Sequence, residues 1–229
     1  MYYWKKIIVV LAVFILIPRM AHSQRFSLLA DIGVIKSQVD GDKIQGFYYN
    51  GYLFGIGSNY AFNEKHFLAI KTSFQQLGSN RKNLFQPRLE DGFQVELDFS
   101  TIALECSYKF DPPSRRFFMG AGVLRHQIVN LDYEIVDNIV KDEDKILIDS
   151  ELLSSSYFSF KFYYGIKLLK RTSLSLAFET AFTDIMKSNL DELRTLKPYL
   201  LAATFSYEII APKIDSNGRR PGTKARQPR

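Results

Sequence analysis

The stretch YFSFKFYYGIKL, residues 157–168, alternates between two kinds of side chain along its whole length. Every even-numbered residue is large and apolar or aromatic, whereas the odd-numbered residues include Lys161, Gly165 and Lys167. Because successive side chains of a β-strand point to opposite faces of a sheet, the pattern predicts a strand with one apolar and one mixed face. In a soluble barrel the mixed face meets water, whereas in a membrane barrel it lines the interior.

Extended segments of this kind follow one another along most of the chain, and none of them has a helical period. Each is about as long as a tilted membrane strand, roughly 9–11 residues, or longer. The eight segments are residues 25–37, 51–63, 66–76, 94–110, 116–129, 156–169, 172–184 and 197–210.

The connections between these segments alternate in length. The short ones are residues 63–65, 111–116 and 169–171. The long ones are polar and cover residues 38–50, 77–93, 130–155 and 185–196. Membrane barrels have short turns in the periplasm and long loops outside the cell, so this segregation favours a membrane barrel.

The short connections also predict which residues face each other, because the numbers of facing residues in a hairpin have a constant sum. In all three hairpins the apolar residues face apolar residues and the mixed residues face mixed residues. The predicted facing pairs are Lys161 with Glu179, Gly57 with Lys71, and Glu105 with Gly122.

The volume of the two faces predicts which one is inside. The interior of an eight-stranded barrel is just wide enough for side chains to fill, so the bulky aromatic face would overfill it. The mixed face is rich in Gly and Ser. It also carries charged residues near the middle of the strands, and each lysine among them would cost about 2–4 kcal/mol if it faced lipid at the midplane. We therefore predict an all-β, eight-stranded antiparallel up-and-down transmembrane β-barrel over residues 24–210. Its polar lumen is expected to hold a charge network of Asp31, Lys71, Glu105, Lys161, Glu179 and Glu208.

The two ends of the chain differ from this body. Residues 1–23 combine Lys5 and Lys6 with an apolar run that is shorter than the roughly 20 residues of a spanning helix, which predicts a cleaved signal peptide. An uncleaved anchor is the alternative. Loss of Lys5, Lys6 and Arg19 would lower the formal net charge from +6 to +3.

The tail, residues 211–229, is rich in Pro, Gly and basic residues and is expected to be a disordered periplasmic segment. It holds six basic residues and Asp215, so the barrel body is slightly acidic and nucleic-acid binding is not predicted. The tail is either passive or contacts an anionic envelope component or a protein partner. The residues predicted to make that contact are Arg219, Arg220, Lys224 and Arg226.

Few residues in the sequence suggest catalysis or the binding of a metal or cofactor. His126 is expected to face inward, and no serine partner for it is evident from the sequence, so no catalytic residue is predicted and the chain is not expected to be an enzyme. No metal or cofactor site is predicted, because the Cys, His and Gly spacings that such sites need are missing. The acidic loop 137–151 is interpreted as a solvated extracellular loop, with binding of a divalent cation left open.

Several segments together resemble the small outer-membrane β-barrel family that includes PorT-like proteins. They are FSLLADIGV (26–34), LDFSTIALECSYKF (97–110), FFMGAGV (117–123) and TSLSLAFETAFTD (172–184). The resemblance implies an eight-stranded barrel in the bacterial outer membrane, but it does not imply the secretion role of PorT itself. The chain departs from outer-membrane proteins that end on an aromatic residue, because a basic tail follows its last segment.

These observations predict a structural or partner-binding outer-membrane barrel, as an accessory to secretion or cell-envelope assembly. Its expected partners are outer-membrane lipid and an envelope protein bound through the tail or the extracellular loops. The alternative is an outer-membrane receptor for a ligand or lipid, or a lipid-modifying barrel enzyme.

Overall fold

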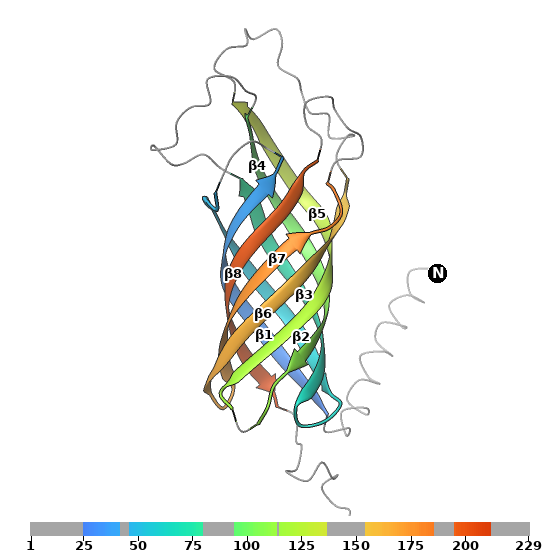
Figure 1. Ribbon diagram of the computed structural model, residues 1–229, viewed down its shortest axis with the longest axis vertical. Coiled ribbons are helices and arrows are strands. Elements are labelled where there is room, and N and C mark those ends of the chain that lie inside the picture. Colours follow the sequence, from blue (N-terminus) through green and yellow to red (C-terminus); the bar gives the residue numbers. More distant parts are fainter. Residues whose placement is uncertain are drawn as a thin grey trace, which may run out of the picture.

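Eight antiparallel strands close into one barrel in the order of the sequence (Figure 1). This computed structural model describes residues 25–41, 46–79, 94–113, 115–136, 154–185 and 195–211. The strands are β1 (Phe26–Asp40), β2 (Tyr49–Ala61), β3 (His66–Ser79), β4 (Gln94–Phe110), β5 (Phe117–Val136), β6 (Ser156–Leu169), β7 (Thr172–Ala181) and β8 (Lys197–Ile210). The predicted eight-stranded antiparallel barrel is confirmed. Residues 1–23, most of the tail and the acidic loop 137–151 lie outside the described residues. Among the residues that are described, no helix is long and apolar enough to cross a membrane.

The barrel has two distinct ends, which we call the turn end and the loop end. Residues 62–65, 111–116 and 170–171 connect the strands at the turn end, where the first strand also begins and the last one finishes (Figure 1). At the loop end β1, β3 and β5 continue past their predicted limits to Asp40, Ser79 and Val136. The barrel is therefore taller at the loop end than the sequence pattern predicted.

Two of the predicted facing pairs are confirmed by the strand register. Lys161 lies opposite Glu179 between β6 and β7. Gly57 lies opposite Lys71 between β2 and β3. Both hairpins have turns of only a few residues, so the position of the turn determines the pairing directly.

The third predicted pair, Glu105 with Gly122, is wrong by two residues. Glu105 lies opposite Leu124, and Gly122 lies opposite Ser107. The predicted faces are still correct, because a shift of two residues returns a strand to the same face.

The cause of this shift is an asymmetric turn between β4 and β5. The Arg115 N–H donates to the carbonyl of Pro112 at 3.1 Å, and the Asp111 N–H donates at 2.7 Å to Lys65 in the neighbouring turn. Proline has no N–H with which to continue the ladder between the strands, so the pairing of β4 with β5 ends at Phe110 and Met119, which lie opposite each other.

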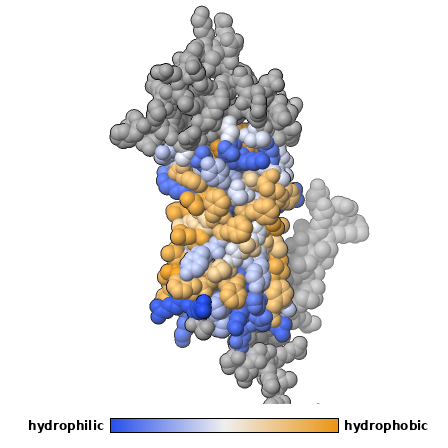
Figure 2. Space-filling view, viewed as in Figure 1, coloured by the Kyte–Doolittle hydropathy of each residue, from blue (hydrophilic) through white to orange (hydrophobic). Residues whose placement is uncertain are grey.

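A broad apolar band surrounds the outside of the barrel (Figure 2). Hydrophilic residues flank the band on both sides in this view. Among its exposed members are Ile32, Phe54, Ile56, Ile70, Leu104, Met119, Phe160, Phe162, Leu176, Phe178 and Leu201. An apolar surface of this extent would be unfavourable in water, whereas a closed barrel satisfies its own backbone and can expose such a band to lipid. The alternative of a soluble barrel is therefore excluded on physical grounds.

Above this band, towards the loop end, the two faces exchange their character. Along β4, Leu104 points outward and Glu105 inward, but closer to the loop end Asp98 is exposed and Phe99 is buried. Along β1, Lys36 is exposed beside the buried Ile35. The loop-end section thus has a polar exterior and an apolar interior, as a soluble barrel does. The expected polar lumen is correct for the turn-end half and wrong for the loop-end half.

Candidate functional site

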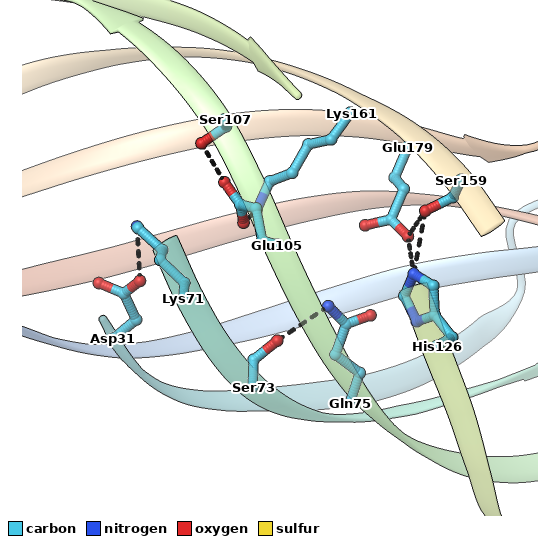
Figure 3. A network of polar contacts seen from close by, with 10 residues as sticks. All are labelled: Asp31, Lys71, Ser73, Gln75, Glu105, Ser107, His126, Ser159, Lys161 and Glu179. Atoms are coloured by element: carbon cyan, nitrogen blue, oxygen red, sulfur yellow. Dashed lines mark hydrogen bonds and ion pairs between the residues drawn. The ribbon is translucent and has the colours of Figure 1, made fainter. Parts of the chain in front are cut away.

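Two ion pairs cross the turn-end half of the lumen (Figure 3). Lys71 on β3 donates to Asp31 on β1, with Nζ 2.7 Å from Oδ2. Lys161 on β6 donates to Glu105 on β4, also at 2.7 Å. The side chains of both carboxylates are only about a twentieth exposed, at 6% and 5%. These are buried charges, and each has a partner within hydrogen-bonding distance.

Each of these pairs reaches over an intervening strand at a glycine. Gly57 on β2 lies beside Lys71, and Gly122 on β5 lies beside Lys161. A Cβ on Gly57 would clash with Cγ of Lys71, so the lysine chain occupies that position, whereas a Cβ on Gly122 would clash with Cβ of Ser107. The missing side chain of Gly57 therefore leaves room for Lys71 to extend across the sheet.

The ion pair of Lys161 is not with Glu179, the carboxylate opposite it in the ladder. Although Glu179 is its neighbour in the ladder, the Lys161 ammonium group contacts Glu105. Glu179 is instead held by a third cluster, where its Oε1 lies 2.6 Å from Nε2 of His126 and accepts a 2.6 Å hydrogen bond from Ser159. The predicted ladder position of Lys161 is therefore correct, but its ion pair is with Glu105.

The third cluster contains a completely buried histidine. The His126 ring stacks on Tyr157 with a centroid distance of 4.3 Å and an interplanar angle of 1°. Its Nε2 lies 2.9 Å from Oγ of Ser159, and its Nδ1 lies 3.3 Å from Oγ1 of Thr101. The prediction that His126 faces inward is confirmed, and its serine partner, which was not evident from the sequence, is Ser159. The sequence could not identify Ser159, because β5 and β6 are joined by a long connection that gives no register.

The arrangement of this cluster is not that of a hydrolytic triad. A triad needs the serine at one ring nitrogen and the carboxylate at the other, so that the base is oriented while it accepts the proton. Here Ser159 and Glu179 both contact Nε2. Ser159 and His126 are also fully buried and cannot reach a substrate. The cluster is best described as a buried carboxylate with two hydrogen-bond donors.

Glu208, the remaining member of the predicted network, lies apart from these pairs. It lines a cavity of about 330 Å³ at the turn end, together with Lys109, Asp111 and Lys167. Lys109 Nζ lies 2.9 Å from Asp111 and 4.2 Å from the centre of the Phe118 ring, and Lys167 contacts the same aspartate. Five of the six predicted residues thus belong to the two ion pairs and the His126 cluster. Glu208 belongs to the cavity at the turn end, which we call the mouth.

A second, smaller cavity continues from this mouth into the lumen. It has a volume of about 40 Å³ and is lined by both ion pairs, Asp31–Lys71 and Glu105–Lys161. The two cavities share lining residues, including Asn59 and Lys109. One polar well therefore runs from the turn end to the middle of the barrel, and its inner part has room for only a few water molecules.

An apolar plug closes the well towards the loop end. Leu53 belongs both to the lining of the inner cavity and to the plug. Each plug residue is at most 6% exposed. The plug consists of Ile35, Val39, Leu53, Leu77, Leu97, Phe99, Tyr157, Ala177, Ala181, Ile185, Leu196, Leu200 and Ala202. The well is consequently blind.

Other predicted sites receive no structural description. Arg219, Arg220, Lys224 and Arg226 lie outside the described residues, as does the acidic loop 137–151. Among the residues that the structure does describe, no three His, Cys, Asp or Glu side chains are grouped as metal ligands.

Comparison with known proteins finds similar folds only. No family model and no curated protein matches the chain, so the PorT-like resemblance stays a prediction. Among solved structures, Ail of Yersinia pestis is 13% identical with a TM-score of 0.39, and the match covers 81% of this chain and 99% of that one. Neisserial surface protein A is 11% identical, with 80% and 97% covered and a TM-score of 0.42. OprG of Pseudomonas aeruginosa is 13% identical, with 81% and 96% covered and a TM-score of 0.39. A likeness at this level carries no information about function.

Proposed function

We propose that the chain is a closed, non-conducting barrel that anchors its loop end above the bacterial outer membrane for a binding partner. It is an eight-stranded barrel of the outer-membrane kind, with an apolar exterior and short turns at one end. In such barrels the short turns face the periplasm and the long loops face outward, so the polar well would open to the periplasm. The observation that carries the proposal is the apolar plug.

The plug argues against transport. An ion or polar solute that entered the well would have to leave water and pass a layer of leucine, isoleucine and phenylalanine side chains that are almost completely buried. Burying an unpaired charge among such groups costs far more than binding in the well would return.

The plug also supports a role for the loop end. Since it gives the strands an apolar core beyond the lipid-facing band, the loop-end section is held together as a soluble barrel would be. Its polar exterior, which includes Lys36, Asn50 and Asp132, stands clear of lipid. A stable section of this kind suits an accessory component of secretion or envelope assembly that positions extracellular loops.

The alternative functions have weaker support from the described residues. A lipid-modifying enzyme would need a histidine with a serine and a carboxylate at the lipid surface. The cluster of His126, Ser159 and Glu179 is fully buried. The histidine on the outer side, His66, packs against Tyr108 and Phe110. A receptor that passes its ligand through the barrel would be blocked by the plug. The proposal therefore favours partner binding.

Thiol labelling tests the blind well. In a Cys106→Ala background, Ser173→Cys in the well should react with a small charged methanethiosulfonate from the turn-end side of proteoliposomes only. Leu77→Cys in the plug should react from neither side, and planar-bilayer recordings should show no stable channels. Rapid reaction of the Leu77→Cys protein, or reaction of the Ser173→Cys protein from the loop end, would contradict the closed lumen.

Photo-cross-linking in living cells tests partner binding at the loop end. A photoreactive residue in place of Lys36, which is exposed above the apolar band, should yield a defined cross-linked protein. The same residue in place of Ile56, which points outward within the band, should yield only lipid adducts. Protein cross-links that form from the turn-end position Lys170 but not from Lys36 would overturn the proposed role of the loop end.

A further inference from the structure

We propose that the turn end carries a binding site for anionic phospholipid, with the headgroup on a basic collar and an acyl chain in an adjoining groove. In the orientation of the proposed function, this lipid belongs to the periplasmic leaflet. Exposed basic side chains surround the turn end. They are Arg25, Lys65, Arg115, Arg116, Lys170 and Arg171, which we call the basic collar.

The collar lies at the depth of lipid headgroups. Arg25 adjoins Phe26, Arg116 adjoins Phe117, and Lys170 adjoins Leu169, which is 74% exposed. In each case the lipid-facing apolar residue nearest the turn end has a basic residue next to it in the chain, on the side away from the band. Figure 2 shows the same sharp change from hydrophobic to hydrophilic residues at this end of the barrel.

The carboxylates near the collar do not neutralise it. Asp111 is buried in the mouth of the well, where it pairs with Lys109 and Lys167 rather than with a member of the collar. Glu208 is partly buried and lines the same cavity as Lys170 and Arg171, so it offsets only part of the collar's charge. Glu64, in the turn beside Lys65, is the one carboxylate on the outer side of the described turns, so the collar keeps a strong positive charge.

The loop end lacks such a bias, so the collar is not a general feature of the barrel rims. Its charged residues in the described part of the chain are of both signs. The basic residues are Lys36, Arg125 and Lys197, and the acidic residues are Asp40, Asp98, Asp132 and Asp184.

An apolar groove begins next to the collar. It has a volume of about 710 Å³ and runs over the outside of the barrel from Phe110 and Met119 towards Phe178 and Leu201. Ala121 makes it deeper, because this small residue stands between Tyr108 on β4 and Phe162 on β6 in the strand register. The groove adjoins the turn that carries Arg115 and Arg116.

A phospholipid satisfies both features at once. Arginine can bind a phosphate through two parallel hydrogen bonds, and each basic residue near an anionic membrane surface adds a favourable electrostatic contribution. The groove lies within the lipid-facing band, so its occupant is an acyl chain rather than a water-soluble peptide. A zwitterionic lipid would fill the groove equally well but would gain less from the collar.

Native mass spectrometry of the folded, delipidated barrel tests this site. Added dioleoyl phosphatidylglycerol should be retained at least roughly tenfold better than dioleoyl phosphatidylcholine. A variant that combines Arg115→Gln, Arg116→Gln, Lys170→Gln and Arg171→Gln should lose this preference. A groove variant, Ala121→Phe, should weaken retention of both lipids.

The matched control removes the same kind of charge from the loop end through Lys36→Gln, Arg125→Gln and Lys197→Gln, and should keep the preference for phosphatidylglycerol. Equal retention of the two lipids by the unaltered barrel, or equal loss in the collar and control variants, would overturn the proposal. Because the assay uses purified barrel, its result does not depend on the partner or on orientation. The photo-cross-linking in living cells tests the proposed function separately.

Discussion

Replacement of Glu105 by leucine is expected to destabilise the folded barrel by about 3–5 kcal/mol, because it leaves the Lys161 ammonium group buried without its partner. The two groups are 2.7 Å apart, and their side chains are only 5% and 14% exposed. Equilibrium unfolding by urea in lipid vesicles, followed by the heat-modifiable gel mobility typical of β-barrels, measures the change.

The double variant Glu105→Leu/Lys161→Met is the matching control. It removes both charges and fills the space with apolar groups of similar size, so its stability should return to within about 2 kcal/mol of the unaltered protein. A charge exchange between Lys161 and Glu179 should give no comparable recovery, since Glu179 is bound to His126 and Ser159. Recovery in that exchange, without recovery in Glu105→Leu/Lys161→Met, would show that Lys161 pairs with Glu179 after all.

The replacement of His126 by leucine should have the second large effect, a loss of about 3 kcal/mol or more of unfolding free energy. Glu179 is 2% exposed and would keep only the Ser159 hydroxyl as a close donor. The stacking of the imidazole on Tyr157 would be lost as well. Urea unfolding in the same vesicles measures this loss.

Two further variants separate the charge from the packing. Glu179→Gln in the His126→Leu background removes the buried charge and should recover most of the lost stability. Ser159→Ala alone should cost about 1 kcal/mol, the usual net value of one hydrogen bond. If Ser159→Ala were as damaging as His126→Leu, the serine rather than the histidine would be the main support of Glu179.

Much of the barrel could be predicted because its signals are local. Alternation over two residues identified the eight strands and assigned each side chain to a face. The tight turns after Ala61 and Leu169 then predicted the partners of Lys71 and Lys161 correctly. The turn after Phe110 did not, since two prolines move its centre by one residue.

The reversal of the faces near the loop end also left a signal in the sequence. Leu97 and Phe99 have the same parity as Glu105, although they are apolar, and Asp98 has the parity of Leu104. When the inward positions of one strand change from polar to apolar, and its outward positions from apolar to polar, the strand has left the membrane but still belongs to the barrel. The prediction treated each strand as having one character throughout, and so it extended the polar lumen too far.

The sequence by itself determined the strands, their order, the face on which each residue lies and the pairs next to two of the three short turns. Only the tertiary structure decided that Lys161 binds Glu105 across Gly122, that His126 meets Ser159 and Glu179, and that a plug closes the well. Alternation specifies whether a side chain points inward or outward. It does not specify the register between two strands that are joined by a long loop, or between β1 and β8 where the barrel closes, and so it does not give the height of a side chain in the lumen. Those heights follow from the stagger of the strands in the closed barrel, and in a lumen this narrow they determine which charges meet.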